Sequence, residues 1–162
     1  MNLAYFRIYG WGKKSERIKE GIKDVRFQRK SILSTISVFG VNASLVFDGT
    51  LNSEVFTHYL EFVLFPTLKK DEIIVMDNCS VHKSKLVREV IERLGINVLY
   101  LPPYSPDLNP IELMWAAMKG FLRKLRARTK EKLIEAIGVA LELVSKVNIV
   151  NWFKHCGYIV KL

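Results

Sequence analysis

A strand–helix–strand pattern over residues 72–101 constrains the fold of this chain more than any other feature. The run EIIVMD (72–77) is short and continuously apolar, which is typical of a central strand buried on both faces. INVLYL (96–101) is a second such strand. The segment between them has one apolar helical face and a terminating Gly95, the face being Leu86, Val87, Val90, Ile91 and Leu94. We expect the two strands to be parallel, as in a right-handed crossover.

The flanking sequence predicts a β-hairpin upstream and helices downstream. Residues 31–40 and 43–50 are β-rich runs, and Gly40-Val41-Asn42 is the expected turn between them. A helix is predicted from Asn52 or Ser53 to a stop near Pro66. Further helices are expected over 109–125 and 129–147, with a short one in 150–158. The order indicates a single α/β domain spanning residues 1–162, with a mixed sheet flanked by helices.

Charge is the most informative part of the composition. The 162 residues carry a net charge of +9, which favours a polyanionic partner such as nucleic acid. No apolar run is long enough to span a bilayer, so no membrane partner is expected. The start of the chain is not a secretory signal, and the two cysteines lack metal-ligand spacing. These observations predict a cytoplasmic protein with reduced thiols.

Two acidic residues fall at the edge where the strands of the crossover end. Asp77 directly follows the first strand, and Glu112 lies in the first turn of the helix that comes after the second. Parallel strands end at the same edge of a sheet, so we expect both carboxylates there, although 34 residues lie between them. Paired carboxylates suit Mg²⁺ or Mn²⁺, and two such ions clamp the attacking and leaving oxygens of a phosphoryl transfer.

The same residues also have structural interpretations. Residues 109–112 fit a capping box with Glu112 as its third helical residue. Asp77-Asn78 fits a turn in which the side chain bonds nearby backbone, and His82 suits the lining of a loop. Asp77 and Glu112 are candidate catalytic and metal-ligating residues because of their joint position, and Asn78 and His82 are accessory candidates. Trp115 fits core packing.

Two blocks carry a resemblance to a known family. VMDNCSVHKS (75–84) and LPPYSPDLNPIELMW (101–115) resemble the second and third catalytic blocks of mariner-like transposases and their prokaryotic insertion-sequence relatives, which belong to the DDE superfamily. YGWGKKSERI (9–18) is similar to the segment after the family's first acidic block. The 34-residue interval resembles that of the prokaryotic branch. The resemblance covers most of the chain, and YSPDLNPIE is its most specific block.

The resemblance implies a ribonuclease-H-like, retroviral-integrase-like catalytic domain. It implies two-metal cleavage and joining of DNA strands during transposition and recombination of a mobile element, with Mg²⁺ or Mn²⁺ held by Asp77 and Glu112. The implied partners are transposon ends and target DNA, and a homodimer is left open. A prokaryotic, nucleoid-associated location in the cytoplasm is also implied.

The sequence departs from the family at its first acid. Residues 1–10 contain no Asp or Glu, so we expect the first strand with its catalytic Asp, and the N-terminal helix-turn-helix, to be missing. Asp48 ends an early strand and fits a peripheral turn better than the site. A missing strand leaves its neighbours with unpaired edges unless a partner chain supplies one. We therefore expect little or no cleavage by this chain alone, and whether it is an enzyme stays open.

Basic residues cluster in two places that suit a DNA backbone. Residues 119–132 hold seven basic residues and one acid, and the N-terminal loop holds a second group. The alternative is a solvated helix end, where the macrodipole accounts only for charges in the last turn. The candidate DNA-binding residues are Lys119, Arg123, Lys124, Arg126, Arg128, Lys13 and Lys14.

Three functional classes follow. The first is the catalytic domain of a transposase, the second a nuclease of the same fold, and the third a non-catalytic remnant that binds DNA or regulates transposase chains. An acidic residue encoded upstream of Met1 would distinguish the first class from the third. Joining of a free 3′-hydroxyl to target DNA separates the first from the second.

Overall fold

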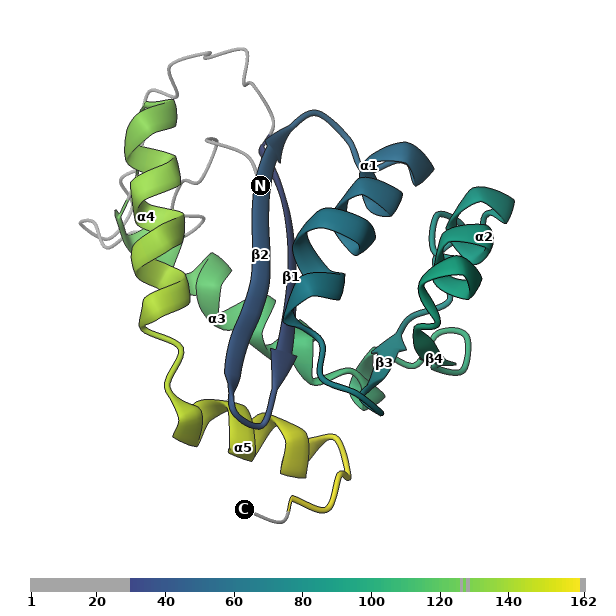
Figure 1. Cartoon of the computed structure of the whole chain (residues 1–162). Coiled ribbons are helices and arrows are strands. Elements are labelled where there is room, and N and C mark those ends of the chain that lie inside the picture. Colours follow the sequence, from purple (N-terminus) through teal and green to yellow (C-terminus); the bar gives the residue numbers. More distant parts are fainter. Residues whose placement is uncertain (1–29, 126, 128, 161–162) are drawn as a thin grey trace, which may run out of the picture.

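The computed structural model describes residues 30–125, 127 and 129–160. Two strands, β1 (Lys30–Ser37) and β2 (Gly40–Asp48), form an antiparallel hairpin in the middle of the molecule (Figure 1). Helices lie on both sides of this hairpin, and α5 lies beyond its tip. The predictions for Lys13, Lys14, Arg126, Arg128 and the segment 9–18 concern positions outside the described residues.

The turn of the hairpin is Val38-Phe39, so the expected turn at Gly40-Val41-Asn42 is wrong. Gly40 already pairs with Ser37 across the ladder, so it begins β2 and lies outside the turn. The ring of Phe39 at the tip is 68% exposed. Ammonium groups of Lys69 and Lys146 lie 5.4 and 5.9 Å from its centroid, close enough for cation–π attraction.

A β-bulge decides which hairpin residues face which helices. The register shifts between Leu33 and Thr35. Val41 and Val46 are five positions apart, so a regular strand would place them on opposite faces. Both pack instead against the cluster formed by α3 and α4, because a bulge adds one residue and reverses the alternation beyond it.

The helix after the hairpin begins as predicted. Asn52 caps α1 (Ser53–His58) by accepting a 2.8 Å hydrogen bond from the backbone N–H of Val55. The helix continues as a π-helical turn, Tyr59–Leu64, and ends in a 3₁₀ turn, Phe65–Thr67, which contains the expected stop at Pro66. The wider turn keeps Tyr59, Leu60 and Leu64 buried together.

The central crossover is confirmed in its order and direction. β3 (Ile73–Met76), α2 (Lys85–Leu94) and β4 (Asn97–Tyr100) follow one another, and β3 pairs with β4 in parallel. Ser84 caps α2, and Gly95 ends it in the left-handed conformation. Leu86, expected on the buried face of this helix, is 42% exposed.

The prediction that both strands are buried on two faces is wrong. Ile73 and Leu99 are 62% and 57% exposed. Among the described residues the parallel pair forms a two-stranded sheet of its own, separate from the hairpin. Helices α1 and α2 cover only the face that carries Ile74, Met76, Val98 and Tyr100.

Three helices complete the described chain. They are α3 (Pro110–Leu125), α4 (Lys130–Glu142) and α5 (Lys146–His155). The helix expected over 129–147 is present but ends earlier than predicted, because the chain leaves it after Glu142 and starts α5 behind a new cap. The hydroxyl of Ser145 accepts a 3.2 Å hydrogen bond from the backbone N–H of Asn148.

Two apolar clusters lie on opposite faces of the hairpin. The first joins α1, its π-helical extension and α2 to Leu33 and Leu45 of the hairpin. The second joins α3 and α4 to Ile32 and Ile36. Trp115 packs against the second cluster, as predicted. In the part of the chain that is described, no helix has the length and apolar character needed to cross a bilayer.

Candidate functional site

Asp77 stands at the carboxyl end of β3, as the sequence predicts. Its Oδ1 accepts a 3.0 Å hydrogen bond from the backbone N–H of Cys79, which forms the expected Asx-type turn. The same oxygen lies 2.8 Å from Nδ1 of His82, a close contact that lacks the alignment of a hydrogen bond. The side chain of Asp77 is 53% exposed, so its carboxylate reaches solvent while one of its oxygens is held by the loop.

His82 is fixed beside Asp77 by contacts of its ring and its backbone. Its ring lies 4.4 Å from the ring of Phe56, measured between centroids. Its carbonyl oxygen accepts a 3.1 Å hydrogen bond from the hydroxyl of Tyr100. The side chain is 15% exposed. These contacts couple the loop after β3 to α1 and β4, and they hold the imidazole against the carboxylate.

Asn78 ties the two parallel strands together where they end. Its Nδ2 donates a hydrogen bond to the backbone carbonyl of Leu101, just past β4. Its Oδ1 is buried and has no hydrogen-bond partner among the described residues. A buried amide oxygen without a partner is uncommon because desolvation is then uncompensated. Asn78 therefore carries a buried, unpartnered amide oxygen in the residue next to Asp77.

Glu112 lies in the first turn of α3, and its carboxylate is exposed. In a capping box this carboxylate would accept a hydrogen bond from the backbone N–H of Asn109. That N–H donates instead to the carbonyl oxygen of Pro106, at 3.0 Å. Within the described part of the chain, no hydrogen bond to the Glu112 carboxylate is formed. The side chain is thus not committed to capping its own helix.

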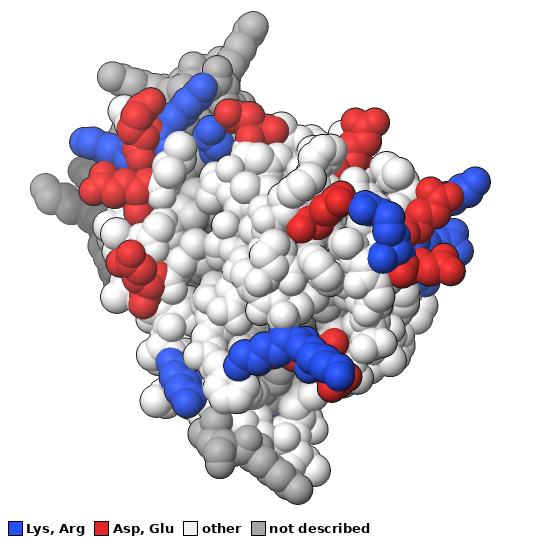
Figure 2. Space-filling view, viewed as in Figure 1, with Lys and Arg blue, Asp and Glu red and all other residues white. Residues whose placement is uncertain are grey.

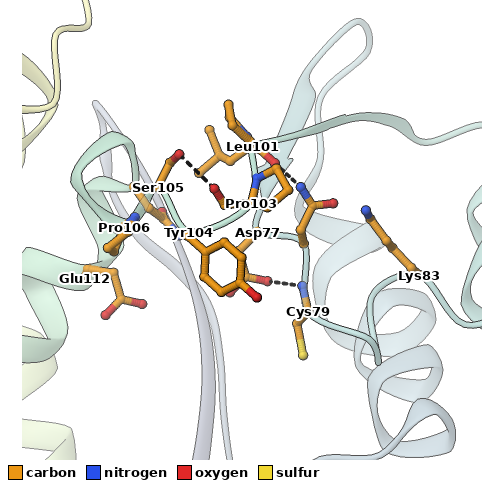
Figure 3. Close-up of a pocket in the computed structure, with 12 residues that line it drawn as sticks. Asp77, Cys79, Lys83, Leu101, Pro103, Tyr104, Ser105, Pro106 and Glu112 are labelled. Carbon is orange, nitrogen blue, oxygen red and sulfur yellow. Dashed lines mark hydrogen bonds between the residues drawn. The ribbon is translucent and has the colours of Figure 1, made fainter.

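Both candidate acids line one hollow of about 410 Å³ at the ends of the parallel strands. Figure 3 shows Asp77 and Glu112 on its walls, with the segment from Leu101 to Pro106 between them. Its lining is drawn from the loop after β3, the segment after β4 and the start of α3: Asp77, Asn78, Cys79, Lys83, Leu101, Pro102, Pro103, Tyr104, Ser105, Pro106, Asn109 and Glu112. The expected meeting of Asp77 with Glu112 at one edge is therefore present.

The oxygen donors of this hollow fit a hard divalent cation. Two carboxylates and an unpartnered amide oxygen are ligands that Mg²⁺ and Mn²⁺ accept. Cys79 adds a soft thiol, which these ions do not prefer. Within the described residues no group of three or more His, Cys, Asp or Glu side chains is arranged to hold a metal. Asp48 lies apart from the hollow and pairs with Lys30 at 2.9 Å.

Several residues of the hollow were not identified as site residues from the sequence, among them three with a thiol, ammonium or aromatic side chain. Lys83 and Cys79 lie in the same loop as Asp77, and Tyr104 lies in the proline-rich turn before Glu112. Their position inside the two motif blocks is the sequence feature that could have identified them. Tyr104 has a second feature that sequence does not reveal, a φ of +57°.

The described basic candidates lie on α3, away from the hollow. Lys119 and Arg123 come seven and eleven positions after Glu112, which places all three on one helical face. Lys124 lies off that face, and all of these basic residues are exposed. The face of the molecule in Figure 2 carries basic and acidic side chains around its rim and few in its centre. The net positive charge is thus not gathered on that face.

A protein-family model described as DDE superfamily endonuclease matches residues 1–134. The chain belongs to this family. Its similarity to mariner-like transposases is confirmed by curated relatives, among them the Tcb1 transposase of Caenorhabditis briggsae, 35% identical over 83 residues. That match covers 49% of this chain and 30% of the relative.

Solved structures with the same fold include Mos1 transposase. A Mos1 paired-end complex with the left transposon end matches 94% of this chain with a TM-score of 0.75 at 19% identity, and the match spans 47% of that protein. A Mos1 mariner paired-end complex with Mn gives a TM-score of 0.73 at 19% identity, over 94% of this chain and 49% of that one. These matches confirm the ribonuclease-H-like α/β fold predicted for the DDE domain.

The chain thus spans less than half the length of these relatives. The region matched by the family model, residues 1–134, contains the two blocks that carried the resemblance in the sequence. The Tcb1 relative comes from a nematode, so it gives no support to the prokaryotic origin expected from the spacing of the acids.

Proposed function

We propose that this chain is a transposase catalytic domain whose metal-dependent chemistry is centred on Asp77 and Glu112. The observation that carries the proposal is the shared hollow, which brings together two carboxylates from opposite ends of a 34-residue interval. A Mos1 structure with Mn supports divalent-metal use by this fold. The Mos1 paired-end complex with the left transposon end supports transposon ends as partners, and target DNA is proposed alongside them. The proposal includes localisation of the protein to nucleoid or chromosomal DNA.

Each side chain of the site has a distinct task in this proposal. Asp77 presents the carboxylate oxygen that the Cys79 N–H does not hold, and His82 keeps the carboxylate oriented from behind. Asn78 holds the ends of β3 and β4 in register. Glu112 supplies the second carboxylate from α3. When bound, a divalent ion lowers the pKa of an attacking water or 3′-hydroxyl and neutralises charge on the leaving oxygen.

DNA contact is assigned to the helix that carries Glu112. Lys119 lies about 10 Å along α3 from Glu112, given a rise of roughly 1.5 Å per residue. Arg123 extends the same face by a further turn. Phosphate contacts from such a row give salt-sensitive affinity without reading sequence. Lys124, Arg126, Arg128, Lys13 and Lys14 are proposed as additional phosphate contacts.

Weak or absent cleavage by the chain alone is the second part of the proposal. The hollow is lined by two carboxylates in the described residues, whereas the family resemblance implies three. Loss even of groups that only support metal ligands costs roughly 10–100-fold in affinity or activity. The specific alternative is a non-catalytic DNA-binding form, and the two-carboxylate lining favours it over a nuclease.

Calorimetric titration with Mn²⁺ tests the metal site. Wild type is expected to bind Mn²⁺, whereas Asp77→Asn and Glu112→Gln are expected to lose most of that binding. Asp107→Asn is the matched control, because Asp107 lies in the turn before Glu112 but not in the lining of the hollow. Equal binding by all four proteins would show that these carboxylates form no metal site.

Cleavage assays separate the remaining alternatives. Robust Mg²⁺-dependent nicking of DNA by wild type, lost in Glu112→Gln, would contradict the proposed weakness of the chain alone. Joining of a donor 3′-hydroxyl to target DNA would support a transposase over a nuclease. DNA binding without metal binding would support the regulatory form.

A further inference from the structure

Tyr104 stands out because its backbone is strained while its side chain is free of intramolecular contacts. Its φ is +57°, in the left-handed region that costs free energy for residues other than glycine. The residue is 102% exposed, the most exposed of the large apolar and aromatic side chains described. Neither packing nor hydrogen bonding by its own ring therefore accounts for this placement.

The backbone around Tyr104 is held by its neighbours. Pro102, Pro103 and Pro106 restrict the turn on both sides. The hydroxyl of Ser105 donates a 3.3 Å hydrogen bond to the carbonyl oxygen of Pro103. The carbonyl of Ser105 accepts a 3.2 Å hydrogen bond from the N–H of Leu108. The turn thus presents the ring in a defined position at the wall of the hollow.

The ring faces the place where the proposed chemistry occurs. In Figure 3 it projects between Glu112 and Cys79, in front of Asp77, and all four residues line the hollow. Lys83 lies on the other side of the same hollow, with its ammonium group 5.6 Å from the ring centroid of Tyr100. An exposed aromatic face and an exposed cation therefore border two carboxylates.

We propose that Tyr104 is a stacking platform for a nucleobase of the DNA strand at the site, and that Lys83 contacts an adjoining phosphate. The inference rests on the proposed function and adds a substrate requirement to it. An aromatic ring stacks on any base, so the contact is indifferent to sequence. Bases inside a duplex are already stacked on both faces, so the ring takes one that is unpaired or turned out of the helix.

Tyr104 is a positioning residue in this proposal, since the ring holds the nucleotide and takes no part in proton transfer. A protein partner is the competing occupant, because tyrosine is also favoured in protein interfaces. The hollow argues for the nucleotide, since an acidic, metal-ligating lining next to a lysine suits a phosphodiester better than an apolar protein surface.

Fluorescence of 2-aminopurine tests the stacking directly. The probe is a DNA duplex with one unpaired 3′-terminal 2-aminopurine, mixed with the full chain in Ca²⁺. Wild type and Tyr104→Phe are expected to quench the probe severalfold, because both keep the ring. Tyr104→Leu keeps an apolar side chain but lacks the ring, so its complex is expected to stay bright. Thermal melting checks that both variants are folded.

Affinity measurements give a second readout. Wild type and Tyr104→Phe are expected to bind the duplex with the unpaired base about tenfold more tightly than a blunt duplex, in line with stacking on one base. Tyr104→Leu is expected to lose this preference and bind blunt DNA as wild type does. Lys83→Met is expected to lower the affinity for both duplexes in a salt-dependent manner. At saturating protein, the quenching of 2-aminopurine is expected to be unchanged.

The outcomes separate this inference from the proposed function. DNA binding with equal quenching by wild type and Tyr104→Leu overturns the stacking role and leaves the proposed function standing. No DNA binding by wild type overturns both. Loss of binding to both duplexes in Tyr104→Leu, with the fold intact, overturns a base-specific role and points to a general surface contact.

Discussion

At the scale of single residues, the two oxygens of Asp77 stand in different surroundings. One is held by the Cys79 N–H and lies close to His82, and the carboxylate as a whole remains half exposed. The structural and functional interpretations of this residue are therefore compatible. For Glu112 the structural interpretation as part of a capping box fails, because the backbone N–H of Asn109 that such a box needs is already bonded to Pro106.

Tyr59 provides a residue-scale prediction about stability. The residue is 2% exposed, and its hydroxyl donates a 2.7 Å hydrogen bond to the carbonyl oxygen of Ala43, which has a φ of +48°. Tyr59→Phe removes the donor and leaves a carbonyl unsatisfied at the bulge. We expect the free energy of unfolding to fall by about 1–3 kcal/mol, measured by urea denaturation.

The pH dependence of Tyr59→Phe is a further check. Burial raises the pKa of the Tyr59 phenol above its ordinary value of 10, and a hydrogen bond with Thr35 offsets part of this. A raised folded-state pKa gives stability that is fully present below pH 10 and is lost as the pH rises beyond it. Tyr59→Phe should weaken this alkaline loss. Tyr104→Phe, whose side chain is 102% exposed, is the matched control, and an equal effect would contradict the role of burial.

At the scale of elements, α3 combines packing with function along its length. Met114, Met118 and Leu122 are buried on one face, while Glu112, Lys119 and Arg123 follow a different, exposed face. This arrangement arises from a 3.6-residue period alone. The helix carries a candidate metal ligand at its N-terminus and candidate phosphate contacts farther along.

Replacing both Lys119 and Arg123 by alanine tests the row on α3. We expect DNA affinity to fall, and the slope of log affinity against log salt to decrease by about 1.8, since each phosphate contact contributes roughly 0.9. Filter binding or fluorescence anisotropy at several salt concentrations measures both. Lys154→Ala, in α5, is the control. An unchanged slope in the double variant would exclude α3 as the track of the backbone.

At the scale of the whole molecule, the described sheet is divided. The hairpin is enclosed between two apolar clusters, whereas the β3–β4 pair has one covered and one open face. Ile73, Val75 and Leu99 are 62%, 39% and 57% exposed on the open side. An exposed apolar surface on a sheet that has two strands among the described residues favours association with other chains.

Substitution of the open face tests this consequence. The double variant Ile73→Thr/Leu99→Thr keeps β propensity while removing apolar surface. We expect it to bind less of the dye ANS and to sediment with less self-association than wild type. Val147→Thr, at a 69% exposed position in α5, is the control. Equal dye binding by the double variant and wild type would show that this face is not the exposed apolar surface in solution.

Local chemistry made most of the elements predictable. The Asn52 cap, the Gly95 stop, the parallel crossover and the start of α3 at Pro110 all follow from capping, backbone freedom or hydrophobic period. The break between α4 and α5 was expected after residue 147 and lies earlier, between Glu142 and Lys146, because the apolar period continues across the Ser145 cap. The turn at Val38-Phe39 was missed because Gly40 looked like the stronger turn signal.

The amino-acid sequence by itself determined that Asp77 and Glu112 meet at one edge, because parallel strands must end on the same side. It also determined the family, through the spacing and identity of two motif blocks. Only the tertiary structure decided which face of β3 and β4 is open, since burial depends on what other elements cover. It also placed Tyr104 at the hollow, because a strained turn and its exposure result from the surrounding chain and leave no local sequence pattern.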